Sequence, residues 1–235
     1  AKEAYEGVRK ILSALYPFDP STLGHSVTTL NPEAGAHPSP QDSRELDAVE
    51  RAARRCVLEF PYFAWRYGER GWRFSLSDGA WLVTLVKYPQ ERIDRQVAWL
   101  NTVLSTRGMP SVLLQRHLEL LYEELTLCVS GSGTGYLKLL RAADRLRDER
   151  CVYGTDAQRM AIENDFEAAV GRDWARRLPG SATILISAVI DDRRGIEGAL
   201  ESVLSWFEDD AVFPDFWRDA VAVAVHAAKS FEEVC

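Results

Sequence analysis

The chain has 235 residues, of which 46% are hydrophobic and 27% are charged, so it can bury a core in one large domain or two small ones. Its 35 acidic and 28 basic residues give a net charge of −7, which argues against general nucleic-acid binding because that needs a strongly basic face. No apolar run approaches the roughly 20 residues that cross a bilayer, so the sequence predicts no membrane span.

The four cysteines lie far apart and include no C-x-x-C pair. This spacing does not support a structural zinc site or a dithiol redox motif. We therefore expect four reduced thiols and a cytoplasmic location, since thiols persist in reducing compartments.

Apolar residues recur with the helical period in nearly every segment. Residues 2–16 show this period and predict an amphipathic helix, whereas residues 17–42 hold five prolines and two glycines and predict a linker. Asp42 followed by Glu45 resembles a capping box, so a helix should begin near Ser43, and Pro61 should kink or end it.

A short aromatic segment should follow as far as Phe74, after which Ser77 or Asp78 caps the next helix. Pro89 and Pro110 are each expected in the first turn of a later helix.

The Gly- and Ser-rich run at residues 130–135 is the best candidate for a domain boundary. Beyond it, the sequence predicts a capping box at Thr155 and Gln158, a break at Pro179–Gly180, a kink at Gly195 and a helix start at Pro214.

These patterns predict an all-α fold of about nine helices, as a bundle or as two sub-bundles. Two stretches, Leu125 to Val129 and Thr183 to Ile190, are apolar or β-branched enough to suit a strand as well. We divide the chain into an N-terminal helix and linker (1–42), a helical bundle (43–130) and a second bundle or a continuation of the first (136–235).

The most unusual feature is an aromatic segment with interleaved arginines. Eight aromatic residues lie between Phe60 and Trp81. Such a mixture can form a core corner, an interface hot spot, or a pocket for a planar or anionic ligand. The candidate binding residues are Tyr62, Trp65, Arg66, Tyr67, Arg70, Trp72, Arg73 and Trp81.

Other candidate sites carry weaker signals. His117 and His226 lie on predicted helices and could each ligate haem iron from one side, although a hydrogen-bonded histidine is the more common reading. The glycine loop at residues 131–135 lacks the Gly-Lys-Ser/Thr ending of a phosphate-binding loop, so we read it as a connection. No metal-ligand spacing occurs and no cofactor is indicated.

One set of short motifs resembles helical bundle modules of bacterial sensory and regulatory proteins, some of which adjoin cobalamin-binding domains. The motifs are Tyr67-Gly68-Glu69-Arg70-Gly71, Ser77-Asp78, Trp99-Leu100, Arg107-Gly108-Met109-Pro110 and His117-Leu118. The resemblance implies a regulatory or sensory module for residues 60–128. The cobalamin signatures are absent, so cobalamin binding is not carried over.

The same motifs also fit a plain helical hairpin. Gly71 and Gly108 would mark chain reversals, Pro110 would start a helix, and Trp99 would pack inward.

The sequence favours a non-catalytic regulatory module that binds a protein partner or itself. The alternative is a sensor that holds a planar molecule such as a tetrapyrrole in the aromatic segment. A third reading is an enzyme whose acids and histidines converge only in space.

Overall fold

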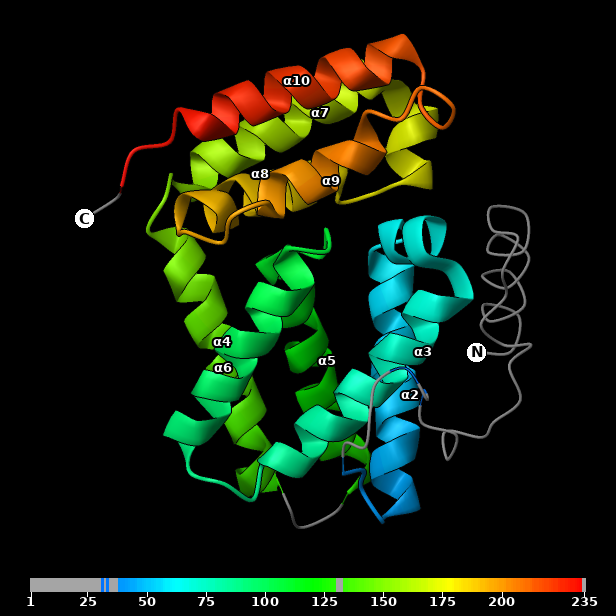
Figure 1. The fold of residues 1–235 in the computed structure, drawn as a ribbon, viewed down its shortest axis with the longest axis vertical. Coiled ribbons are helices and arrows are strands. Elements are labelled where there is room, and N and C mark those ends of the chain that lie inside the picture. Colours follow the sequence, from blue (N-terminus) through cyan, green and yellow to red (C-terminus); the bar gives the residue numbers. More distant parts are fainter. Residues whose placement is uncertain (1–30, 32, 34–37, 130–132, 234–235) are drawn as a thin grey trace.

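The computed structural model describes residues 31, 33, 38–129 and 133–233, and these form nine helices and no strand (Figure 1). The all-α prediction is confirmed. The helix expected at residues 2–16, and most of the linker after it, fall outside the described residues. The helices are α2 (Ser43–Glu59), α3 (Tyr62–Leu85), α4 (Gln90–Ser105), α5 (Ser111–Cys128), α6 (Gly133–Cys151), α7 (Asp156–Arg177), α8 (Ser181–Arg193), α9 (Ala199–Phe207) and α10 (Asp215–Lys229).

Several helix starts agree with the sequence. The Asp42 carboxylate accepts a hydrogen bond from the backbone N–H of Arg44 and caps α2. Thr155 and Gln158 form the complete capping box of α7. Prolines stand at the N-cap positions of α4, α5 and α10, one residue earlier than the first turn predicted for them: Pro89, Pro110 and Pro214.

The prediction of a separate aromatic segment before a helix at Ser77 is wrong. Helix α3 runs from Tyr62 to Leu85 as one element with a kink at Gly68, where φ is +55° and ψ is −143°. The Ser77 hydroxyl does not cap a helix but donates to the Phe74 carbonyl oxygen at 3.0 Å, within the helix. A hydroxyl satisfied by its own preceding turn is compatible with a helix interior.

The expected kink at Gly195 is also corrected. Helix α8 ends at Arg193 and α9 begins at Ala199, so these are two separate helices. Gly195 and Gly198 have positive φ angles of +90° and +81°. These values are incompatible with a continuous helix and separate α8 from α9. The two stretches that suited a strand are helical, in α5 and α8.

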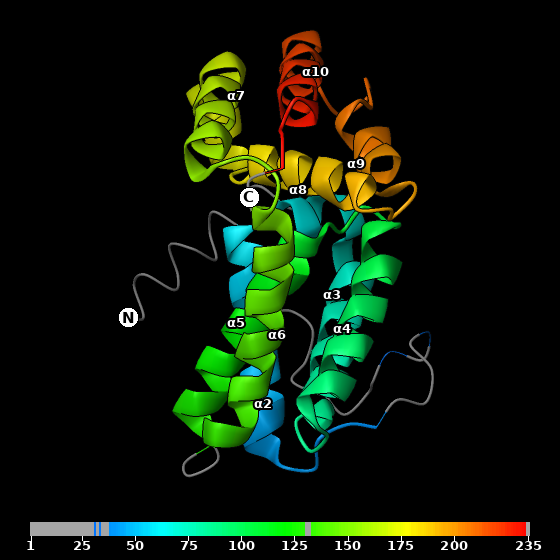
Figure 2. The ribbon, with the colours of Figure 1, turned by 90° about the vertical axis from the view of Figure 1, so that its left-hand side faces the viewer.

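The buried residues form two large clusters. The first, which we call the lower core, joins α2, α3, α4, α5 and α6. The second, the upper core, joins α7 to α10 with Tyr62 of α3 and the first turn of α5. Helices α8 and α9 lie across the ends of α2–α6, and α7 and α10 pack on their outer side (Figures 1 and 2). Of the run at residues 130–135, expected to mark a boundary, residues 133–135 begin α6 and residues 130–132 fall outside the described residues.

Asp191 fixes the junction between the two cores. Its side chain is fully buried and accepts hydrogen bonds from Ser105 Oγ at 3.1 Å and from Ser111 Oγ and the Ser111 backbone N–H, both at 2.6 Å. The carboxylate therefore sits at the N-terminus of α5, where the helix dipole favours negative charge. This contact holds both ends of the turn between α4 and α5.

Candidate functional site

A cavity of about 900 Å³ lies between α2, α3, α4 and α5. Helix α3 supplies the longest wall, α4 and the turn after it face that wall, and α2 and α5 supply buried apolar residues. The volume is within the range of small-molecule pockets in proteins.

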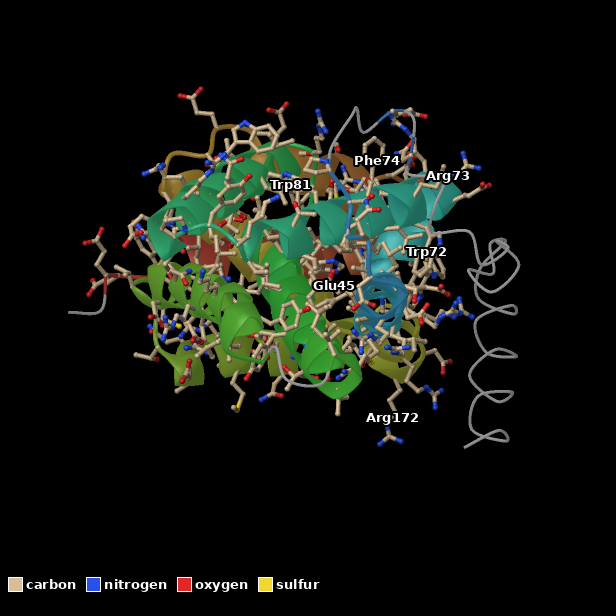
Figure 3. All side chains as sticks on the ribbon, turned by 90° about the horizontal axis from the view of Figure 1, so that it is seen from below. Glu45, Trp72, Arg73, Phe74, Trp81 and Arg172 are labelled. Atoms are coloured by element: carbon tan, nitrogen blue, oxygen red, sulfur yellow. The ribbon has the colours of Figure 1, made fainter. Side chains whose placement is uncertain are left out.

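The walls of the cavity are rich in aromatic rings. Trp81 of α3 and Trp99 of α4 meet edge to face across it, with ring centroids 6.1 Å apart. Phe63 and Tyr67 form a second pair, at 5.6 Å. Figure 3 shows Phe74 on the side of α3 away from α2, whereas Trp72 points toward α2. Rings arranged in this way can hold a flat apolar ligand by stacking and edge contacts.

Four of the predicted binding residues line the cavity: Arg66, Tyr67, Arg70 and Trp81. The other four do not. Tyr62 is fully buried in the upper core. Trp72, with 3% of its surface exposed, packs in a third, small cluster with Ala53, Val57 and Ala64. Trp65 packs against the upper core and this small cluster. Arg73 is exposed and pairs with Glu69 on its own helix.

Asp78 of α3 is a polar group of the cavity that sequence reasoning did not select. Within the described part of the chain its carboxyl makes no hydrogen bond and no ion pair. Burial raises the pKa of this carboxyl from 3.8 to about 7, against the opposing effect of the nearby Arg107 guanidinium. The group is therefore divided between its protonated and ionised forms near neutral pH.

His117 of α5 is the second polar group. Only 8% of its surface is exposed, and burial lowers its pKa to about 4, so the imidazole is neutral at pH 7. Its Nε2 atom is buried and has no hydrogen-bond partner among the residues that the structure describes. A Cβ atom placed on Gly79 would lie 3.0 Å from this nitrogen, so the glycine allows the ring to approach α3.

Three arginines surround the cavity. The Arg66 guanidinium stacks on the Tyr67 ring at 5.2 Å and donates to the Ser202 carbonyl oxygen of α9. Arg70 forms an ion pair with Glu33 at 2.9 Å. Arg107, in the turn between α4 and α5, is exposed and has no ion pair or side-chain hydrogen bond with any described residue.

The lining thus has the opposite charge balance to the whole chain. Three arginines face two carboxyl groups, Glu33 and Asp78, and the second of these is partly protonated. The chain as a whole carries −7. This local excess of positive charge favours an anionic ligand.

The residues that the sequence did not identify belong to the motifs that carried the family resemblance. Asp78, Trp99 and Arg107 all reach the cavity, together with His117, which the sequence selected only as a candidate haem ligand. The hairpin reading of these motifs is wrong in two points: Trp99 is 53% exposed and does not pack inward, and Gly71 lies inside α3. Gly108 does occur in a chain reversal, with φ of +82°.

A helical spacing could have revealed part of this site. Gly71, Phe74, Asp78 and Trp81 follow steps of three and four residues and share one face of α3. This spacing was missed because the aromatic segment was predicted to end at Phe74 and a new helix to begin near Ser77.

The remaining candidates do not meet in one place. His226 is exposed on α10, whereas His117 lies in the lower core, so the two candidate haem ligands do not face a common site. Of the glycine loop, residues 131–132 fall outside the described residues and residues 133–135 begin α6. No group of three metal-ligating side chains occurs in the described ranges, and none of the helices there is long and apolar enough to cross a membrane.

Comparison with known proteins adds no family. No protein-family model matches the chain, and no curated protein or solved structure shows significant similarity to it.

Proposed function

We propose that the protein binds a planar, mostly apolar organic anion in the cavity between α2, α3, α4 and α5. The main support for this proposal is a cavity of about 900 Å³ that combines aromatic walls with an excess of arginine, in a chain that is acidic overall. Aromatic walls suit the body of such a ligand, and a guanidinium suits its acidic group.

This proposal takes the second of the sequence hypotheses rather than the first. A protein-binding surface would use exposed aromatic anchors. Two of the strongest candidates for that role, Tyr62 and Trp72, are instead buried against the chain's own cores. Trp99, which is 53% exposed, borders the cavity.

Two fluorescent probes with one shared ring system test the proposal. 8-Anilinonaphthalene-1-sulfonate carries a negative charge, and N-phenyl-1-naphthylamine is the same skeleton without the sulfonate. We expect both to bind at one site and to quench tryptophan emission, because Trp81 and Trp99 line the cavity. The sulfonate should add affinity, and Arg107→Gln should remove that gain while leaving the neutral probe unaffected.

A cavity-filling variant shows where the probes bind. Val103 lines the cavity from α4, so Val103→Trp should weaken both probes by about tenfold or more, roughly 1.4 kcal/mol. Ala98→Trp adds the same side chain at an exposed position of the same helix and serves as the control. Circular dichroism verifies that both variants remain helical. Probe binding that is equal in Val103→Trp and wild type, or no binding to wild type, would contradict the proposal.

A tetrapyrrole is a narrower form of the same proposal. It is planar, and the unpartnered Nε2 of His117 is the type of atom that ligates haem iron. Addition of haem should then give a visible band that His117→Leu removes. A band that persists in this variant would place the haem elsewhere.

A further inference from the structure

Arg107 and Asp78 form a polar corner of the cavity. Neither side chain forms an ion pair or a side-chain hydrogen bond with any described residue. The Arg107 guanidinium is close enough to act on the Asp78 carboxyl electrostatically, yet the two form no ion pair. The other arginines are already engaged, Arg70 with Glu33 and Arg66 with the Ser202 carbonyl oxygen. Arg107 is therefore the guanidinium best placed to receive an acidic group.

The other titratable groups that face this corner come from every surrounding element. Helix α5 contributes the neutral His117, and α2 contributes Cys56, whose pKa is raised to about 12 by burial and which is uncharged at neutral pH. Helix α3 contributes Arg66, Arg70 and Tyr67, and the segment before α2 contributes Glu33. Burial raises the pKa of the Tyr67 phenol, which stays protonated. His117, Cys56 and Tyr67 therefore stay uncharged near pH 7 and do not replace Asp78 as the group that takes up a proton.

A ligand anion placed at Arg107 would lie beside the Asp78 carboxyl. Two negative groups that share one guanidinium in a partly buried site repel each other, and one of them must take up a proton. A ligand sulfonate, or a ligand carboxylate of ordinary acidity, has a lower pKa than Asp78. Asp78 is therefore the group that accepts the proton.

Building on the proposed function, we propose that the ligand's acidic group is held between the Arg107 guanidinium and the protonated Asp78 carboxyl, so that the anion binds together with a proton. The proton comes from the solvent and forms the O–H bond of Asp78. That O–H then donates a hydrogen bond to the ligand anion, and no other bond is made or broken. Binding of such ligands is therefore favoured at lower pH, and the same cavity discriminates against them when Asp78 is ionised.

The test measures probe affinity by fluorescence between pH 6 and pH 8.5. The sulfonate of 8-anilinonaphthalene-1-sulfonate stays ionised throughout, so any change in proton binding belongs to the protein. With a pKa of about 7 for Asp78, affinity should fall by about thirtyfold across this interval, with a slope that approaches one proton per ligand above pH 8. The neutral probe should show little dependence on pH.

Two variants test whether Asp78 is the group that takes up the proton. Asp78→Asn should still bind the anionic probe but with an affinity that no longer changes with pH. Asp210→Asn, at an exposed position on the connection after α9, should behave as wild type. The inference is overturned if wild type binds the anion with no dependence on pH, or if Asp78→Asn keeps the full dependence. Absence of binding by both probes would instead overturn the proposed function, and the inference with it.

Discussion

The Asp78 carboxyl should leave a signature in the stability of the protein even without a ligand. Its pKa is 3.8 in an ordinary solvated setting and about 7 in the folded chain, because burial disfavours the charged form. Between these two values the folded protein holds more protons than the unfolded chain does. The contribution of Asp78 to the free energy of unfolding therefore falls as the pH rises through this window, and it levels off above pH 7 to 8.

The size of this effect follows from the pKa difference. A shift of one unit corresponds to 1.36 kcal/mol, so the full difference sets an upper bound of about 4 kcal/mol. Asp78 retains some contact with solvent, which screens the charge, so we expect a loss of about 2 to 4 kcal/mol. Asp78→Asn cannot ionise and should escape this loss.

Urea unfolding of wild type and Asp78→Asn at several pH values between 4 and 8.5 measures the effect. The stability of the variant relative to wild type should rise by about 2 to 4 kcal/mol from pH 4 to pH 8. Any fixed cost of placing an amide in the cavity is the same at every pH and leaves this change intact. A difference between the two proteins that stays constant with pH would refute the argument that Asp78 is buried and unpaired.

Two further predictions follow from the polar residues of the lower core and its junction. His117 has a pKa lowered from 6.5 to about 4, so the unfolded chain binds more protons at this position, and the stability of wild type relative to His117→Leu should fall by about 2 kcal/mol from pH 7.5 to pH 5 in the same urea titration. The opposite contribution of Asp78 is common to both proteins and cancels in this difference. Asp191→Ala removes a buried carboxylate that accepts three hydrogen bonds at the junction of the two cores, and should lower the free energy of unfolding by about 3 to 5 kcal/mol, whereas a loss under 1 kcal/mol would show that the junction does not depend on it.

The sequence predicted the helical class and many helix limits because these depend on local chemistry. The proline before α10 and the capping box of α7 act within a few residues of their own positions. The errors arose where tertiary packing decides. Gly68 bends α3 without ending it, and the aromatic residues on the two sides of the bend are buried in different clusters, Tyr62 in the upper core and Trp72 in the small cluster with Ala53 and Val57.

The site was harder to predict because its members come from separate helices. Asp78, Arg107 and His117 are up to 39 positions apart in the chain and have no spacing that identifies them as one group. The arginine-rich aromatic segment did indicate a region that can bind a ligand, but only one face of α3 opens into the cavity. The segment's other residues, such as Trp72, pack in the core, and composition alone cannot separate the two faces.

The distribution of charge within the cavity also determines how a ligand would be oriented. Arg70 and Arg107 are exposed, whereas His117 and the apolar residues around it on α2 and α5 are buried. Burial raises the pKa of Asp78 and lowers the pKa of His117. Both shifts favour the uncharged form of the side chain. The interior is therefore close to neutral and the positive charge lies at the exposed side. A ligand that fits this arrangement places its apolar body against α2 and α5 and keeps its acidic group at Arg107, beside Asp78.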